Sequence, residues 1–337
     1  MRPPVTKTPQ SPRQTKFLAN RLVIPQPRHD LSQNRLKTTT DGTYIMGRLL
    51  LPNRRAAIRP AWLALAASLL LLAALRPAAA QTPSPLAEWQ YSSGIQLQRL
   101  FEPTVPTWQV ELGAGGQFAP VADGIARYQV QGGPAINIRY KDLFFASSGE
   151  GIGFNLFSFR HIRFGAAVTY DLGRSPHEDG EALTGLGTIH AAPEAKIFAT
   201  TVLTESFPLT IRVDARKQIG ATNGYIGDVG AYLPMPGSSA KFAWFLGPTV
   251  TVADKRYMNA YFGISATQAA NTHYRQYKAN GGFKSAGLGL STVYFVTPHF
   301  IIALNGAFDR LLGSAALSPI TQTKYEMVGS LSALYKF

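Results

Sequence analysis

The chain has 337 residues, 45% of them hydrophobic and 15% charged, which is enough for one large domain or two ordinary ones. Its formal net charge of +14 comes mainly from residues 1–80, with 13 Lys and Arg against 2 Asp and Glu, whereas residues 81–337 hold 20 against 17. The basic surface of a nucleic-acid-binding protein should lie on its folded part, so DNA and RNA are disfavoured as partners. Because Cys is absent, disulfides, thiolate metal sites and an acylated lipoprotein Cys are excluded.

The first 45 residues are polar, basic and rich in Pro, Thr and Gln, with no apolar periodicity. Such a composition cannot bury enough apolar surface to fold. We interpret residues 1–45 as a disordered, non-native extension and expect the natural chain to start at Met46.

Residues 46–80 have the pattern of a secretory signal peptide. Several Arg residues precede the uncharged 15-residue run Ala61–Leu75, and small residues follow it. This run is shorter than the about 20 apolar residues that a membrane-spanning helix needs. We expect cleavage after Ala80, with Ala78 as the other small residue of the motif, so that the mature chain begins at Gln81 and residues 81–106 form a periplasmic segment.

Beyond residue 107 the sequence repeatedly alternates apolar and polar residues, as β-strands do. In residues 207–218, Ile211 and Val213 lie on one face, whereas Arg212, Asp214 and Arg216 lie on the other. Three charges on one face of a strand would be costly in a soluble core but suit the interior of a membrane barrel whose apolar face meets lipid. The charges expected in the barrel lumen are Arg163, Asp171, Arg212, Asp214 and Arg216.

The alternation predicts an all-β fold, a transmembrane antiparallel β-barrel of about 12 strands over residues 107–337. Short and long connections alternate between these strands, as in outer-membrane barrels with short periplasmic turns and long outer loops. The two shortest strands leave ten or fourteen strands open as alternatives. The expected strands are 107–118, 127–140, 143–148, 151–157, 160–173, 192–204, 207–218, 225–235, 240–253, 281–295, 298–310 and 323–337.

The last strand ends the chain on an aromatic residue. Leu331, Tyr335 and Phe337 share its apolar face, which we expect to contact outer-membrane lipid. A closed barrel needs this strand to pair with the first one, because an open edge in lipid leaves backbone groups unsatisfied. We interpret the three residues as the signal that the outer-membrane assembly machinery reads. An ordinary terminal strand of a periplasmic sandwich is the alternative.

The sequence contains no motif that identifies a catalytic, metal or cofactor site, and we expect none. One charged group stands beside aromatic residues at the start of the longest expected loop, 254–280. It could bind the phosphates of lipopolysaccharide or another ligand, or Asp254 could pair with its neighbours and order the loop. The residues of this candidate loop binding site are Asp254, Lys255, Arg256, Tyr257 and Tyr261.

Four stretches go beyond a generic strand pattern: YDLGRS (Tyr170–Ser175), LTGLGTIHAAPEAKIFA (Leu183–Ala199), ADKRYMNAYFGISATQAA (Ala253–Ala270) and RLLGSAALSPI (Arg310–Ile320). They resemble signatures of the MipA/OmpV family, the MltA-interacting outer-membrane proteins of Gram-negative bacteria. In the last stretch, Ser314 replaces the usual Asp of the family. The resemblance runs from about Trp108 to Phe337. It implies a barrel in the cell outer membrane, and a scaffold for a murein transglycosylase and a murein synthase that act on peptidoglycan at its inner face.

Three classes of function remain open from the sequence. A structural or scaffolding barrel of the cell envelope agrees with the resemblance and with the lack of catalytic motifs. A narrow pore for small solutes agrees with the lumen charges, although twelve strands leave an interior that such side chains can fill. An outer-membrane hydrolase would need a nucleophile, a base and an orienting group in contact, and no such set can be identified.

Overall fold

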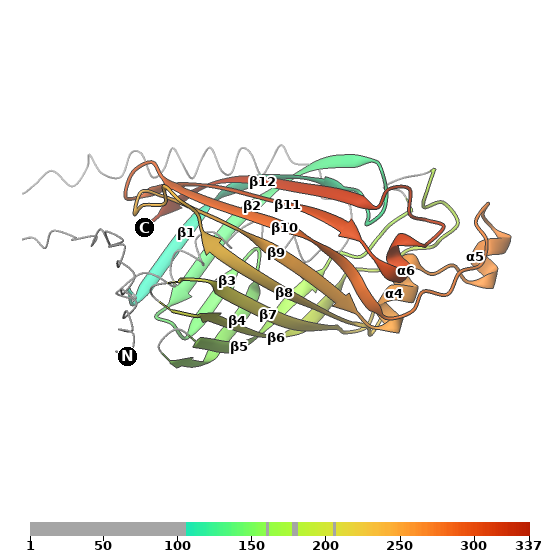
Figure 1. Ribbon diagram of the computed structural model, residues 1–337, viewed down its shortest axis with the longest axis horizontal. Helices are drawn as coiled ribbons and strands as arrows, with labels where there is room; N and C mark the ends of the chain where they lie inside the picture. The colour runs from blue at the N-terminus through green and yellow to red at the C-terminus, as the bar shows by residue number, and fades with distance from the viewer. Residues whose placement is uncertain (1–105, 160–161, 177–180, 205–206) are drawn as a thin grey trace, which may run out of the picture. The chain divides into compact units, whose positions relative to one another are not determined.

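The computed structural model describes residues 106–159, 162–176, 181–204 and 207–337. Their twelve strands form one closed antiparallel barrel in which each strand pairs with its neighbours in the chain and β12 pairs with β1 (Figure 1). The predicted barrel of 12 strands is thereby confirmed. The strands are β1 Trp108–Pro120, β2 Tyr128–Tyr140, β3 Phe144–Ser147, β4 Gly151–Phe159, β5 Ile162–Asp171, β6 Ala192–Val202, β7 Thr210–Gln218, β8 Tyr225–Pro234, β9 Phe242–Ala253, β10 Gly282–Phe295, β11 Phe300–Leu311 and β12 Tyr325–Lys336.

The seam between the first and last strands is regular. Its register runs from Glu111 opposite Lys336 to Phe118 opposite Gly329. Gly113 lies on this seam, and any Cβ there would collide with the backbone carbonyl of Ala333. The close approach therefore requires glycine, and the closure leaves neither terminal strand with an open edge.

The two ends of the barrel differ. The end that holds the C-terminus has mostly short connections, and we call it the terminus end. The opposite end, the loop end, carries the long connections and the helices α4 Lys255–Phe262, α5 Ala266–Ala270 and α6 Gly313–Ala316 (Figure 1). No helix in the described part of the chain is long and apolar enough to cross a membrane.

The segment 254–280 was expected to be a loop, and this is wrong for α4 and α5. Asp254 caps α4 by accepting a hydrogen bond of 2.8 Å from the backbone N–H of Tyr257. Ser265 and Gln268 form a capping box at the start of α5. Both helices are short, so their apolar residues show too few repeats for a helical period to stand out in the sequence.

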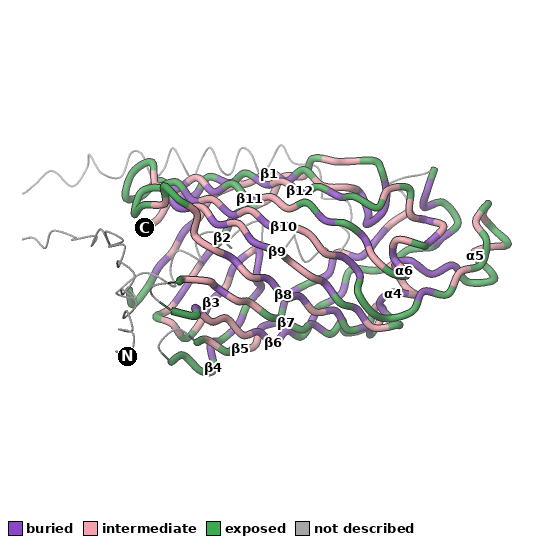
Figure 2. The backbone as a smooth tube through the Cα atoms, viewed as in Figure 1, coloured by how far each residue is buried: buried purple, intermediate pink, exposed green. Residues whose placement is uncertain are grey.

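More buried and more exposed residues alternate along much of the strands (Figure 2). On β12, Met327 and Leu331 are exposed, whereas Val328 and Ser330 are buried inside. On β7, Val213 is exposed, and Asp214 and Arg216 are buried. The outer face is apolar and the inner face largely polar, which is the reverse of a soluble core and the pattern of a barrel surrounded by lipid.

Candidate functional site

Charged side chains gather inside the barrel, and the largest group surrounds Arg216 on β7. The Arg216 guanidinium lies 3.2 Å from the Asp214 carboxylate and 3.8 Å from the carboxylate of Glu194, and it also contacts Asp228 on β8. Asp228 accepts a further hydrogen bond of 2.6 Å from the Thr251 hydroxyl on β9. The buried arginine thus joins β6, β7 and β8, and the Asp228–Thr251 hydrogen bond adds β9. The three carboxylates more than compensate the charge of the arginine.

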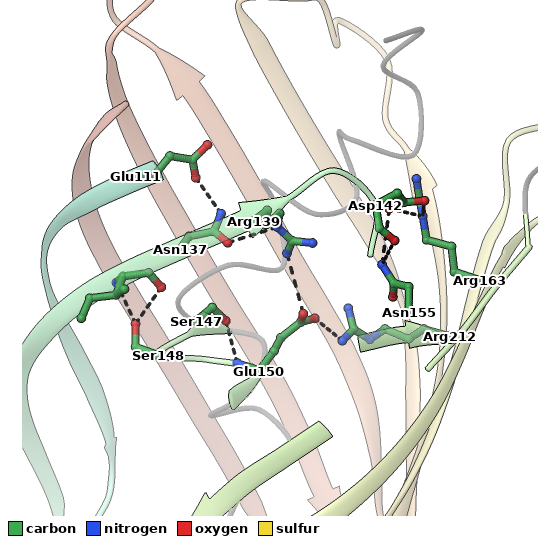
Figure 3. Close-up of polar contacts among 11 residues, drawn as sticks. Glu111, Asn137, Arg139, Asp142, Ser147, Ser148, Glu150, Asn155, Arg163 and Arg212 are labelled. Atoms are coloured by element: carbon green, nitrogen blue, oxygen red, sulfur yellow. Dashed lines mark hydrogen bonds and ion pairs between the residues drawn. The ribbon is translucent and has the colours of Figure 1, made fainter. Parts of the chain in front are cut away.

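A second group is centred on Glu150, in the turn between β3 and β4 (Figure 3). The Glu150 carboxylate contacts the guanidinium of Arg212 on β7 and lies 3.8 Å from that of Arg139 on β2. Arg139 also donates a 3.1 Å hydrogen bond to Asn137, which in turn donates one of 2.7 Å to Glu111 on β1. The chain of contacts connects β1 and β2 to β7 across the interior.

A third group lies near the loop end. The Lys284 ammonium on β10 contacts the carboxylate of Asp123 in the β1–β2 connection, and both residues are buried. The Glu326 carboxylate on β12 accepts a hydrogen bond from the backbone N–H of Gly124. These contacts tie the β1–β2 connection to strands on the other side of the seam.

The long connections pack over the loop end as an apolar cap, which consists of two clusters of buried side chains. The first cluster is built around α4, with Tyr257, Met258 and Phe262 almost fully buried. The second brings together four long connections, with Val121, Leu183, Ile264 and Ile320 each from a different one. Although these segments are far apart in the sequence, their packing gathers apolar side chains from four connections at the loop end. The buried members are Ile226, Ala253, Tyr257, Met258, Tyr261, Phe262, Ala279, Leu311 and Ala315 in the first, and Val121, Ala122, Ile125, Ala182, Leu183, Leu186, Ile264 and Ile320 in the second.

Polar contacts fix the cap to the strands below it. The Tyr261 hydroxyl on α4 donates a 2.7 Å hydrogen bond to the Asp171 carboxylate at the end of β5. Arg174 donates a 2.7 Å hydrogen bond to the backbone carbonyl of Tyr261. Burial and the negative charge of Asp171 raise the pKa of the Tyr261 hydroxyl well above its ordinary value. The hydroxyl therefore remains a donor at every physiological pH.

The five charges expected in the lumen all lie on inward positions of β5 and β7. Asp171, Asp214 and Arg216 are buried, and Arg212 is half-buried. Arg163 lies close to the terminus end, where its guanidinium is 2.8 Å from the half-exposed carboxylate of Asp142. The structure divides the set among the Arg216 group, the Glu150 group, the cap contact and this separate ion pair.

The candidate loop binding site does not form one exposed surface. Asp254 acts as the helix cap, and Tyr257 and Tyr261 are buried in the cap cluster. Lys255 and Arg256 are exposed. Helical spacing explains the division, because positions three and four apart turn the two tyrosines inward and the two basic residues outward.

The three residues of the proposed assembly signal lie at the end of the chain, on the outer face. Leu331 and Phe337 are exposed, and the rings of Tyr335 and Phe337 meet edge to face, with centroids 5.0 Å apart. The Phe337 backbone N–H donates a 3.0 Å hydrogen bond to Val110 on β1. The proposed cleavage residues Ala78, Ala80 and Gln81, like residues 1–45 and 46–80 and all of 81–106 except Pro106, lie outside the described residues.

Sequence reasoning missed several members of these groups. Glu150 and Asp123 lie in connections, where no strand parity could assign them to the interior. Lys284 lies beside an irregularity in the β9–β10 register, which breaks the parity count. Among the described residues, no group of three His, Asp or Glu side chains is arranged to hold a metal ion.

The family model described as MltA-interacting protein MipA matches residues 112–337, which include all strands from the middle of β1 onward. The chain belongs to this family. The match confirms the resemblance seen in the sequence, and with the closed barrel it makes the chain a MipA-family outer-membrane β-barrel protein. No curated protein matches the chain.

Solved outer-membrane barrels are similar to this MipA-family chain at low sequence identity. The NanC porin is 7% identical, with 68% of this chain and all of that chain covered and a TM-score of 0.33. An outer-membrane channel from Pseudomonas putida F1 is 10% identical, with 70% and 97% covered and a TM-score of 0.36. OprB from Pseudomonas putida is 13% identical, with 61% and 59% covered and a TM-score of 0.31.

Proposed function

We propose that this MipA-family barrel has a structural role in the cell envelope and serves as a scaffold rather than as an open pore. The observation that carries the proposal is the packed cap over an interior that holds several buried ion pairs. A general pore needs a continuous aqueous path, whereas here α4 and the long connections cover the loop end. Below them, the Glu150 group reaches from β2 to β7, and the Arg216 group ties together the neighbouring strands β6, β7 and β8.

The scaffold would present its terminus end to the periplasm. Outer-membrane barrels place short turns and both termini on that side. The family description names an interaction with MltA, which suggests a murein transglycosylase as the partner. A murein synthase as a second partner follows only from the sequence resemblance. On this proposal the barrel holds the enzymes near the peptidoglycan and performs no reaction itself.

Exposed residues at the terminus end offer a surface for such a partner. Lys141 and Lys241 lie in the turns after β2 and β8, and Lys336 lies at the end of β12, each of them exposed or half-exposed. Two of these side chains lie over tyrosine rings, Lys141 over Tyr140 at 5.4 Å and Lys241 over Tyr294 at 5.7 Å. Aromatic rings are enriched in protein interfaces, and the positive charge of the lysines would steer an acidic surface of a partner toward this end.

The test is a pull-down of the tagged, full-length protein from cross-linked envelopes. A murein transglycosylase should be recovered with the wild-type protein and lost when Lys141, Lys241 and Lys336 are all replaced by Glu. The matched control replaces Lys255, Lys278 and Lys324, which are exposed on the loop-end connections. Equal recovery of the enzyme with both triple variants would refute the terminus-end surface, and no recovery with any form would refute the scaffold.

A further inference from the structure

The wall of the barrel is not equally high all round. β2 pairs with β1 along its whole length, from Trp108 opposite Tyr140 to Pro120 opposite Tyr128. On its other side, the ladder with β3 covers only residues 137–140 of β2. β3 and β4 join in a turn halfway up the wall, and β4 pairs with β5 only as far as Val168. We call the part of the wall above this turn, between Tyr128–Ile136 of β2 and Thr169–Asp171 of β5, the notch.

Specific contacts hold the lower border of the notch in place. Ser148, at the turn, exchanges hydrogen bonds with the backbone of Ile136: its hydroxyl accepts one of 2.9 Å, and its N–H donates one of 3.0 Å. The Tyr170 hydroxyl on β5 donates a 2.8 Å hydrogen bond to the Ser148 carbonyl. Inside, Glu150 contacts Arg212 and lies within 3.8 Å of Arg139. The short hairpin is thus a built feature, tied to both sides of the notch.

The border along β2 has an unusual composition for a strand edge. Because Ile136 directs its N–H and C=O toward the turn, the alternation of the strand directs those of Val130, Gly132 and Pro134 to the same side. Pro134 has no N–H, which disfavours the addition of another strand here. Val130 and Gly132, nearer the loop end, each present an N–H donor. A bare backbone donor in lipid is costly unless an acceptor reaches it.

The surroundings favour an amphiphile with its head toward the loop end. Arg127, just before β2, is exposed and forms no ion pair among the described residues. The outer faces of the strands at the lower border are apolar, with Ile152 and Val168 both exposed. On the inner side, a Cβ added to Gly133 would meet no heavy atom within 4 Å, so space is present beside the edge. From the loop end toward the turn, the positive charge of Arg127 comes first, the N–H donors of Val130 and Gly132 come next, and the apolar surface comes last. A phospholipid carries its phosphate, its acyl linkage and its acyl chain in the same order.

We propose that the notch binds an acyl lipid of the outer leaflet whose phosphate head carries a net negative charge. The phosphate lies at Arg127, oxygens of the acyl linkage accept from Val130 and Gly132, and an acyl chain lies over Pro134 and the turn. This site is independent of the proposed scaffold function, because it lies on the lipid side of the loop half of the barrel.

The chain contains no Cys, so a single introduced thiol can carry a fluorescent label. The reporter is bimane on Gly133→Cys, at the notch. The control is bimane on Gly329→Cys, which also has open space at its Cβ but faces the bulk lipid from the closed wall of β12, on the same face as Met327 and Leu331. Both variants must first show heat-modifiable migration as folded barrels. They are then placed in phosphatidylcholine nanodiscs that contain a fixed minor fraction of brominated lipid, either phosphatidylglycerol or phosphatidylcholine.

Brominated phosphatidylglycerol should quench the Gly133 label several-fold more than brominated phosphatidylcholine does. Arg127→Gln should abolish this preference, and Arg127→Lys should largely retain it. The Gly329 label should respond equally to both lipids in every background. Equal quenching by the two lipids at Gly133 would overturn the anionic head, and no quenching there would overturn the site itself. Loss of quenching at Gly133 in a protein that migrates as a dimer would instead indicate that the β2 edge is covered by a second copy.

Discussion

The Tyr261 hydroxyl lies 2.7 Å from the Asp171 carboxylate and joins the cap helix α4 to the end of strand β5. Asp171 also accepts a 2.6 Å hydrogen bond from the backbone N–H of Gly173, and the Tyr261 hydroxyl accepts one of 3.2 Å from the Gln218 amide. One buried tyrosine thereby connects a long connection to two strands. The cap is a part of the folded barrel and not a separate lid.

Tyr261→Phe should weaken the cap and lower the stability of the barrel. The change removes the hydroxyl but keeps the ring, so Asp171 loses a buried donor at a cost of about 1–3 kcal/mol. Urea unfolding of the protein in detergent measures the effect. Tyr225→Phe is the control, because Tyr225 is exposed and the ring over which Lys217 lies is retained. Similar midpoints for both variants would show that the Tyr261 contact does not stabilise the fold.

Glu150→Gln should be among the more destabilising single changes in the interior. It leaves Arg139 and Arg212 near each other without the carboxylate between them, and the loss of one partner of a buried ion pair costs about 3–5 kcal/mol. Asp142→Asn breaks the partly exposed pair with Arg163 and should cost only about 0–1 kcal/mol. Urea unfolding again measures the effect. If the two variants lose the same free energy of unfolding, the contacts of Glu150 do not stabilise the interior as a buried ion pair should.

Val213→Arg should impair assembly. Val213 lies in the middle of β7 on the exposed outer face, where an arginine in lipid costs about 2–4 kcal/mol. Phe300→Arg is the matched change on the same face at the start of β11, where the cost falls to about 0–1 kcal/mol. The fraction of heat-modifiable barrel in the outer membrane reports the result. Equal tolerance of both arginines would mean that this face does not contact lipid.

Phe337→Ala should reduce the amount of barrel delivered to the outer membrane more than it reduces the stability of the folded barrel. The Phe337 ring is exposed, and alanine keeps the backbone N–H that donates to Val110. Refolding in detergent should therefore stay near normal, while cells accumulate less barrel and more degraded protein. Phe337→Tyr preserves an aromatic terminus and should behave like the wild type. If the alanine variant also refolds poorly in detergent, Phe337 is a packing residue and not an assembly signal.

The strands could be predicted because strand parity is a local property of the sequence. In β7, alternate residues from Ile211 to Arg216 differ so sharply in polarity that one face of the strand must contact lipid and the other must point into the barrel. The same alternation predicted about 12 strands with ten or fourteen as alternatives, and the closed pairing shows twelve. The C-terminal strand was equally clear, because Leu331 and Tyr335 repeat on one parity to the end of the chain.

The site was harder to predict, because its contacts join residues that are distant in sequence and lie partly outside strands. Lys284 contacts Asp123 across more than half of the barrel sequence, and neither residue belongs to a motif. Tyr257 and Tyr261 look like exposed loop residues until the helix that turns them inward is known. The notch depends on the lengths of the β2–β3 and β4–β5 ladders, which a strand list alone does not give.

Planar-bilayer conductance of the refolded, full-length protein tests the central claim, that the cap and the paired interior charges close this barrel. With Tyr261 and the cap in place, the protein should insert, as shown by its heat-modifiable form, and give no stable conductance steps at either polarity. A positive control with a known porin establishes that the bilayer detects open barrels. Long-lived ohmic steps from the wild-type protein, with a size that scales with salt concentration, would contradict the closed barrel and favour a solute pore.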